Sequence, residues 1–227
     1  MSDTNNLSRG INFYNQKMYG DALTFFLSIT PGHDEEANDV LYYLGLCYAK
    51  LKHYEDALMY LEQVVTSSKI QERVLQCRFI LAVIYAVSGR KRLANFELGK
   101  LKDTGYKTCE VYSVLAYVAW EQGEVEQCMD YYSHALSLDP ENVTALNGMG
   151  YVLACQEKDL GKALSYCKKA VDYAPDSAAC LDSLGFVYYK LGLFKDARRF
   201  LEQAESIDTQ NQEIAEHIKT VMLESVK

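Results

Sequence analysis

Few residues in this sequence have the types and the spacing that a catalytic centre or a metal site needs. Ser165 and Lys168 match the SxxK spacing of a serine nucleophile with a lysine base. They lie in the middle of an expected helix with no partner motif, so we interpret them as part of an ordinary helix face. His33 and the three acidic residues after it could hold a metal or begin a helix. Acidic residues favour the N-terminal end of a helix dipole, so we predict a cap and a solvated loop.

The cysteines are scattered singly, and their number is odd. A disulfide framework favours an even count and a zinc site favours close CxxC pairs, and neither pattern occurs here. We therefore expect the cysteines to act as small apolar side chains in a reducing compartment. The alternative is an enzyme that uses one of them as a reactive cysteine. The seven positions are Cys47, Cys77, Cys109, Cys128, Cys155, Cys167 and Cys180.

The histidines add no catalytic constellation. His53 and His134 are isolated, and His217 is expected on the exposed side of a C-terminal helix. No HExxH, GxSxG or Walker motif occurs. We predict that the chain is not an enzyme, and we expect no catalytic residue, no cofactor and no metal.

Charge and hydropathy narrow the class of partner. The formal charge of −8 argues against nucleic acid, because phosphate binding needs a basic stripe. The one basic cluster, residues 90–92, is interpreted as a solvated helix start. No apolar run approaches the roughly 18 residues that cross a bilayer, and no secretory signal is visible at the N-terminus. We expect a cytoplasmic protein without direct membrane insertion.

The whole chain is organised by one internal repeat. Small residues recur at steps of 35, 37, 34, 34 and 35 residues, and a second small residue follows further along each copy. The first set is Gly10, Gly45, Ala82, Ala116, Gly150 and Gly185; the second is Ala22, Ala57, Ala94, Cys128, Ala163 and Ala197. Apolar residues with helical spacing predict two amphipathic helices per copy, whose backbones approach closely at the small residues.

Breaks between the two helices of each copy are expected near six residues. These are Lys17, Lys52, Gly89, Gly123, Asp159 and Gly192. Asp139 and Pro140 are predicted to start a helix, with Asp139 as N-cap. Residues 210–225 place Ile214, Ile218, Val221 and Met222 on one apolar stripe, which predicts a helix that caps the open end of the stack.

A period of about 34 residues, with Leu-Gly, a Tyr three positions later and an Ala further on, resembles the tetratricopeptide repeat (TPR). The match is strongest in copies two, five and six, and the last copies look like those of bacterial TPR proteins. The resemblance implies an all-α fold: a right-handed α-solenoid of six helix-turn-helix repeats and a capping helix, forming a single domain over residues 1–227. The expected repeats are 3–36, 38–71, 75–108, 109–142, 143–177 and 178–209.

The resemblance also implies a site. In TPR solenoids the first helix of each copy lines a concave groove, and here the matching positions are apolar in the N-terminal half and mixed in the C-terminal half. The alternative is that these side chains are mostly core. The Lys/Asn/Arg clamp of the chaperone-binding subfamily has no counterpart in this sequence. The predicted groove residues are Tyr42, Leu46, Phe79, Val83, Tyr117, Trp120, Asn147, Tyr151, Phe186 and Tyr189.

These observations favour a scaffold or adaptor that binds an amphipathic or apolar segment of a protein or peptide partner. The alternative is a cytoplasmic chaperone that shields an apolar segment of a secreted or membrane-associated client. Self-association into a homo-oligomer is also open. Solenoid geometry serves many roles, so the sequence does not name the partner.

Overall fold

The computed structural model describes residues 3–224, with side chains from residue 7 onward, and within this range every regular element is an α-helix. The predicted all-α class is therefore confirmed. The helices are α1 (Asp3–Asn15), α2 (Tyr19–Leu27), α3 (Asp34–Lys50), α4 (Tyr54–Ser67), α5 (Gln71–Val87), α6 (Lys91–Asp103), α7 (Cys109–Glu121), α8 (Val125–Leu138), α9 (Val143–Cys155), α10 (Leu160–Tyr173), α11 (Ala178–Lys190), α12 (Phe194–Ile207) and α13 (Gln212–Glu224).

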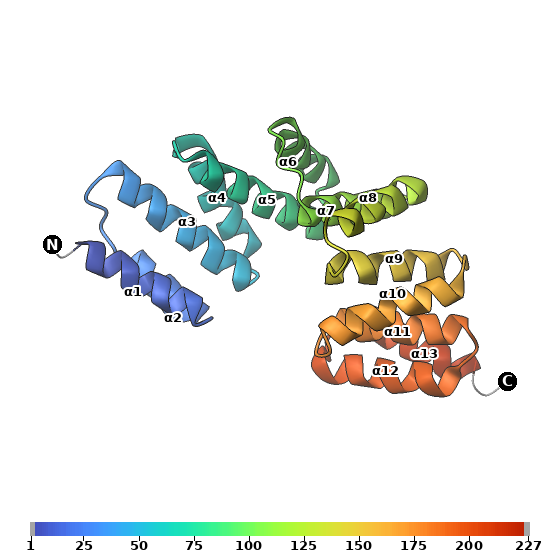
Figure 1. The fold of residues 1–227 in the computed structure, drawn as a ribbon. Helices are drawn as coiled ribbons and strands as arrows, with labels where there is room; N and C mark the ends of the chain where they lie inside the picture. Colours follow the sequence, from blue (N-terminus) through green and yellow to red (C-terminus); the bar gives the residue numbers. More distant parts are fainter. Residues whose placement is uncertain (1–2, 225–227) are drawn as a thin grey trace. The chain divides into compact units, whose positions relative to one another are not determined.

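The helices form two compact units, unit 1 ending at Tyr106 and unit 2 beginning at Lys107. Unit 1 holds the pairs α1/α2, α3/α4 and α5/α6, and unit 2 holds α7/α8, α9/α10 and α11/α12, followed by α13 (Figure 1). Within each unit, neighbouring pairs also pack on one another, as α4 does on α5 and α10 on α11. A single domain over residues 1–227 stays a prediction, and its end residues 1–2 and 225–227 lie outside the described residues.

All six predicted breaks fall on residues with a left-handed backbone. The φ angles are 62° at Lys17 and Lys52, 71° at Gly89, 77° at Gly123, 45° at Asp159 and 73° at Gly192. The turn after α11 shows why: the Leu193 N–H donates to the Tyr188 carbonyl over 2.9 Å, and the Gly192 N–H to the Tyr189 carbonyl over 2.9 Å. This is the Schellman arrangement, which satisfies the last carbonyls of a helix when one residue turns left-handed.

The small residues bring the two helices of a pair into close contact. A Cβ added to Gly45 would lie 2.7 Å from Leu61, and one added to Gly185 would lie 2.7 Å from Leu201. The second small residue of every pair is fully buried: Ala22, Ala57, Ala94, Cys128, Ala163 and Ala197. The predicted close approach of the backbones is confirmed.

Helix α13 closes the apolar end of unit 2. Ile214, Ile218 and Val221 are buried in a cluster with Leu181 and Leu201 of the last pair. Met222, which we assigned to the same stripe, is 43% exposed, so that assignment was wrong. It follows Val221 directly, and one step along a helix turns a side chain by about 100° away from a narrow stripe. The predicted end of this helix, residue 225, lies outside the described residues.

Two predicted helix starts had different outcomes. His33 is the N-cap of α3: its Nδ1 accepts from the Glu36 N–H at 3.2 Å, while Glu36 Oε2 accepts from the Gly32 N–H at 2.7 Å. The bond from the Glu36 N–H to the His33 side chain confirms the cap. Asp139, however, follows the end of α8, and α9 begins only at Val143 with Asn142 as N-cap. The helix start predicted at Asp139 and Pro140 was wrong by three residues.

Candidate protein-binding surface

Five of the predicted groove residues lie on the first helices of the pairs in unit 2, and we call this set the aromatic wall. The helices α7, α9 and α11 contribute Tyr117, Trp120, Tyr151, Phe186 and Tyr189. Four of the rings are in contact in series: the centroids lie 6.2 Å apart for Trp120 and Tyr151, 5.3 Å for Tyr151 and Phe186, and 6.1 Å for Phe186 and Tyr189. Tyr117 lies three residues before Trp120 and shares its face of α7. The wall arises because equivalent residues on successive first helices lie side by side.

The side chains of the aromatic wall are partly packed and partly accessible. Tyr117 is 38% exposed, and the other four residues are half-buried. Burial raises the pKa of the Tyr117 hydroxyl, and the charges of Glu121 and Glu213 raise it further. Burial also raises the pKa of Tyr151, with added effects from Cys155 and from Glu213. These side chains therefore serve both as core and as surface, and both phenols are neutral near pH 7.

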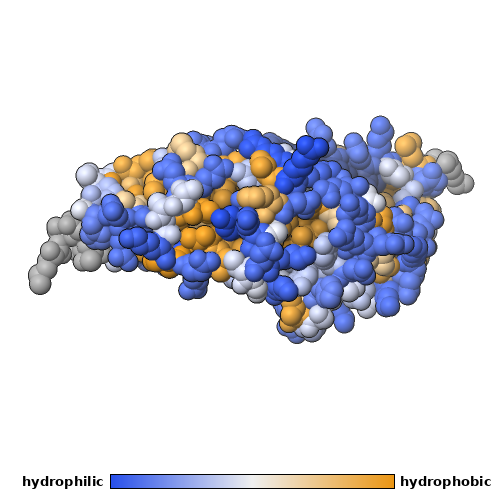
Figure 2. Space-filling view, turned by 90° about the horizontal axis from the view of Figure 1, so that it is seen from above, coloured by the Kyte–Doolittle hydropathy of each residue, from blue (hydrophilic) through white to orange (hydrophobic). Residues whose placement is uncertain are grey.

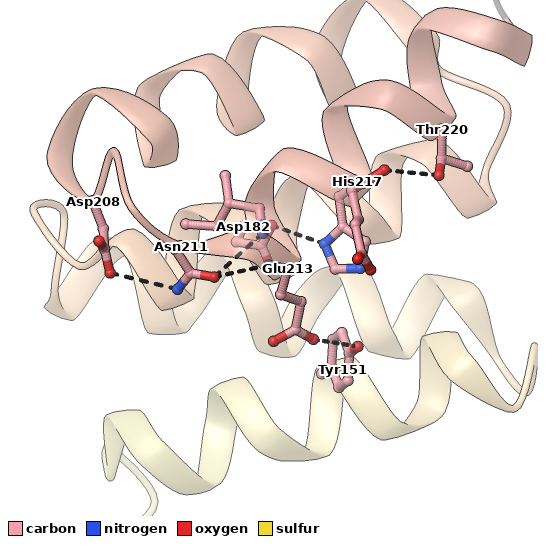
Figure 3. Close-up of polar contacts among 9 residues, drawn as sticks. Tyr151, Asp182, Asp208, Asn211, Glu213, His217 and Thr220 are labelled. Carbon is pink, nitrogen blue, oxygen red and sulfur yellow. Dashed lines mark hydrogen bonds and ion pairs between the residues drawn. The ribbon is translucent and has the colours of Figure 1, made fainter.

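Helix α13 adds polar side chains to the aromatic wall (Figure 3). The Tyr151 hydroxyl donates to Glu213 Oε1 at 2.9 Å, and His217 Nδ1 lies 2.9 Å from Asp182 Oδ1. The His217 ring lies 4.7 Å from that of Phe186. Our assignment of His217 to the exposed side of this helix was wrong, because its side chain is only 14% exposed. The repeat spacing could have predicted this position, because His217 follows Asp182 by 35 residues, which is one repeat period.

The pKa of His217 results from opposing effects. Burial alone lowers it, because a charged imidazolium loses hydration. The hydrogen bond and charge of Asp182, together with the charges of Glu213 and Glu216, outweigh burial and raise the pKa above its ordinary value of 6.5. The contact with Asp182 therefore stabilises the protonated form of the His217 ring.

The polar positions of this face differ in their access to a partner. Asp182 is 6% exposed and Ser113 is 3% exposed, and the Ser113 hydroxyl donates to the Cys109 carbonyl at 2.8 Å. The predicted groove residue Asn147 is half-buried, and its Oδ1 has no hydrogen-bond partner in the structure. This oxygen is itself buried, so it is not accessible to a segment bound on the surface.

The four predicted residues in unit 1 are placed differently. Leu46 is buried, so it offers little surface, whereas Tyr42, Phe79 and Val83 are half-buried. The Tyr42 hydroxyl donates to Gln76 Oε1 at 3.0 Å, and the Arg73 guanidinium lies 5.4 Å from its ring. Burial is the main cause that raises the pKa of Tyr42 to about 12. Binding through these residues stays a prediction.

Unit 1 also has an open depression of about 520 Å³ that no predicted groove residue lines. Arg90 pairs there with Glu55, and the Tyr85 hydroxyl donates to Glu62 nearby. The lining residues are Glu55, Leu58, Met59, Glu62, Gln63, Thr66 and Arg90.

The cysteine thiols are unpaired, and most are inert by environment. Burial raises the pKa of Cys47, Cys77 and Cys128, and that of Cys167, to about 12. The thiolate, which is the nucleophile, is therefore nearly absent at neutral pH in these residues. This environment disfavours the reactive-cysteine alternative.

The net charge of the protein comes from unit 2. Residues 107–227 hold 19 Asp and Glu against 11 Lys and Arg, whereas residues 1–106 hold 12 of each. In the space-filling view, hydrophobic residues are more widely exposed on the unit 1 part of the visible face, and the unit 2 part is mostly hydrophilic (Figure 2). The aromatic wall thus belongs to the acidic unit.

Comparison with known families agrees with this architecture. Models of the tetratricopeptide repeat match residues 39–68, 110–142 and 141–210, which together make up more than half of the chain. The helix pairs, the left-handed turns between them and the close contacts at small residues are those of stacked repeats. The chain belongs to the tetratricopeptide repeat family.

Relatives of known sequence share parts of the chain. A TPR repeat-containing protein of Pseudomonas aeruginosa is 34% identical over 87 residues, which are 38% of this chain and 15% of that protein. A human protein O-mannosyl-transferase is 24% identical over 169 residues, 73% of this chain and 19% of that protein. The chain spans less than a fifth of the length of either relative.

Solved structures show the same fold at low sequence identity. The Cut9–Hcn1 hetero-tetramer of the APC/C contains a chain with a TM-score of 0.77 at 13% identity, covering 95% of this chain and 42% of that one. A tetratricopeptide repeat protein from Parabacteroides merdae gives 0.74 at 16% identity, covering 95% and 82%. YrrB, described as a TPR protein with an unusual peptide-binding site, gives 0.51 at 17% identity, covering 79% and 91%.

No helix among residues 3–224 combines the length and the apolar character that a membrane span requires.

Proposed function

We propose that this protein is a non-enzymatic scaffold or adaptor that binds a segment of a protein or peptide partner on the aromatic wall of unit 2. The observation that carries the proposal is the contact series from Trp120 through Tyr151 and Phe186 to Tyr189, in which every residue is only half-buried. Aromatic side chains provide large contact area at low entropic cost and are enriched among the residues that dominate binding energy.

Further support comes from chemistry and from fold. An amphipathic or apolar segment matches a surface of half-buried and exposed aromatic rings. YrrB, which shares the fold, has a peptide-binding site by its description. A cytoplasmic location belongs to the proposal, because seven unpaired thiols suit a reducing compartment. Nucleic acid and direct membrane insertion are not part of it.

The test compares two exposed tyrosines of unit 2. Tyr117 lies on the aromatic wall, and Tyr173 is 49% exposed on α10, a second helix of its pair. Wild type, Tyr117→Ala and Tyr173→Ala serve as baits in a lysate of the native organism, after circular dichroism shows equal folding. We expect partners that are retained by Tyr173→Ala and lost from Tyr117→Ala.

Two results would count against this proposal. Retention of every partner by Tyr117→Ala contradicts binding on the aromatic wall. Suppression of a captured partner's aggregation at stoichiometric ratios points instead to the chaperone alternative.

A further inference from the structure

We infer that the partner segment brings a lysine or arginine side chain to the aromatic wall, and that this cation lies on the rings of Tyr117 and Tyr151 beside the carboxylate of Glu213. The inference rests on the proposed function and specifies the chemistry of its partner. It combines three observations: the identity of the rings, the position of the Glu213 carboxylate and the distribution of charge in the chain.

The position of Glu213 is the first step of the argument. Its Oε1 accepts from the Tyr151 hydroxyl at 2.9 Å, so the carboxylate is fixed at the edge of the aromatic wall. Tyr117 lies three residues before Trp120 on α7, so the two side chains share one face of that helix, and the Trp120 ring lies 6.2 Å from that of Tyr151. The Glu213 charge also contributes to the raised pKa of Tyr117. A cation over these rings would therefore gain both a π face and a negative partner.

The opposite end of the aromatic wall already shows this contact within the chain. Lys190 Nζ lies 5.5 Å from the Phe186 ring centroid and 5.9 Å from that of Tyr189. The same nitrogen lies 2.8 Å from Glu157 Oε1. The aromatic wall thus already binds one lysine of the chain, Lys190, on two rings and beside a carboxylate. We propose the equivalent contact for a partner at Tyr117, Tyr151 and Glu213.

Charge complementarity decides between a cationic and an anionic partner. Unit 2 carries the entire net charge of −8, because unit 1 has as many basic as acidic residues. An acidic segment would meet the Glu213 carboxylate and the field of this unit, whereas a basic segment would be attracted from a distance. The observations therefore favour a segment with an apolar face and at least one basic side chain.

Trp120 provides a direct reporter of occupancy. It is the only tryptophan in the chain, and its ring lies 6.2 Å from that of Tyr151. Two synthetic amphipathic helical peptides share one leucine face and carry either lysines or glutamates on the other. Titrated into the full chain, the lysine peptide should shift the Trp120 emission with a Kd about tenfold lower than that of the glutamate peptide.

A matched pair of variants locates the effect. Glu213→Gln keeps an acceptor for Tyr151 and removes one negative charge, and Glu205→Gln removes one negative charge from an exposed position on α12. We expect the lysine peptide to bind Glu213→Gln about fivefold more weakly, the size of one charge contact near a surface. Its affinity for Glu205→Gln should stay that of wild type.

Each of the other outcomes contradicts either the cation inference or the proposed function. If the glutamate peptide binds as tightly as the lysine peptide, the aromatic wall binds apolar segments and the cation inference is wrong. Equal losses in Glu213→Gln and Glu205→Gln would show general attraction to an acidic unit and also contradict the inference. If neither peptide changes the Trp120 emission, the aromatic wall is not a binding surface for such segments, and the proposed function fails with it.

Discussion

The Tyr151 hydroxyl donates a hydrogen bond to Glu213 Oε1 at 2.9 Å, although the two residues are 62 positions apart in the sequence. Tyr151 belongs to α9 and Glu213 to α13, and α11 packs against both helices. The C-terminal helix therefore has two roles. It covers the apolar end of unit 2 with Ile214 and contributes Glu213 and His217 to the aromatic wall.

The contact between His217 and Asp182 makes the stability of unit 2 dependent on pH. The folded protein holds the His217 pKa above its ordinary value of 6.5, so the folded state binds the proton more tightly than the unfolded state. The stabilisation is fully present below about pH 6.5 and is lost as the pH rises through the folded-state pKa. The difference in unfolding free energy between wild type and His217→Gln should therefore fall from pH 6 to pH 8.5.

The measurement is urea denaturation followed by Trp120 fluorescence, which reports on unit 2. Asp182→Asn serves as the second variant, because it removes the negative charge beside His217 and keeps the side-chain size. It should flatten the pH dependence as His217→Gln does. A wild-type pH dependence in both variants would show that this contact does not control it.

The capping role of α13 predicts unequal effects for two of its apolar residues. Ile214 is 2% exposed and Met222 is 43% exposed. Ile214→Ala should lower the free energy of unfolding by about 2 to 4 kcal/mol, because it leaves a cavity against Leu181 and Leu201. Met222→Ala should change it by no more than about 0.5 kcal/mol. Urea denaturation followed by Trp120 fluorescence measures both, and similar effects would argue against the cap.

The fold could be predicted because every repeat has small residues at the same positions, where its two helices pack together. Gly45 and Gly185 lie where an added Cβ would meet Leu61 or Leu201. The spacing of the small residues therefore indicates where the two helices of a pair approach closely. The breaks at Lys52 and Gly192 were predictable for a related reason: helix periodicity stops there and resumes in a new phase. Local pattern and long-range packing agree at these positions.

The aromatic wall could be predicted only in part. Repeat positions placed Tyr117, Tyr151 and Phe186 on one face, because equivalent residues of stacked helices lie side by side. The position of His217 was missed because the capping helix lacks the Leu-Gly pair by which the other copies are aligned. Its polar sequence suggested exposure, whereas the exposure of a side chain depends on helices distant in the sequence, here through Asp182.

The left-handed turns predict opposite effects for two exchanges in unit 1. Lys52 has φ 62° and Gly89 has φ 71°, at the same point of successive repeats. A residue with a Cβ pays about 1 to 2 kcal/mol in this conformation, and glycine does not. Lys52→Gly should raise the free energy of unfolding by about 0.5 to 1 kcal/mol, since part of the gain is offset by the greater freedom of the unfolded chain.

Gly89→Ala should lower the free energy of unfolding by about 1 to 2 kcal/mol. An added Cβ at Gly89 would meet no atom within 4 Å, so this loss isolates the backbone conformation from packing. Thermal and urea denaturation followed by circular dichroism measure both variants. A stabilising Gly89→Ala would contradict the assigned turn geometry.

The close contact of α9 and α10 predicts a specific loss in unit 2. A Cβ added to Gly150 would lie 2.4 Å from Cys167 Sγ and 3.0 Å from the Ala163 carbonyl oxygen. The thiol could rotate, but the carbonyl belongs to a helix backbone, so the two helices would have to separate. Gly150→Ala should lower the free energy of unfolding by about 1 to 3 kcal/mol, despite the higher helix propensity of alanine.

Gly161 is the matched control for this exchange. It lies in the first turn of α10, where an added Cβ would meet nothing closer than Asp159 Oδ1 at 3.7 Å. Gly161→Ala should therefore leave the free energy of unfolding unchanged or raise it by up to about 1 kcal/mol. Urea denaturation followed by Trp120 fluorescence reports on both variants within the same unit. If Gly150→Ala were as stable as Gly161→Ala, the distance between α9 and α10 could increase without loss of stability. Gly150 would then not determine that distance.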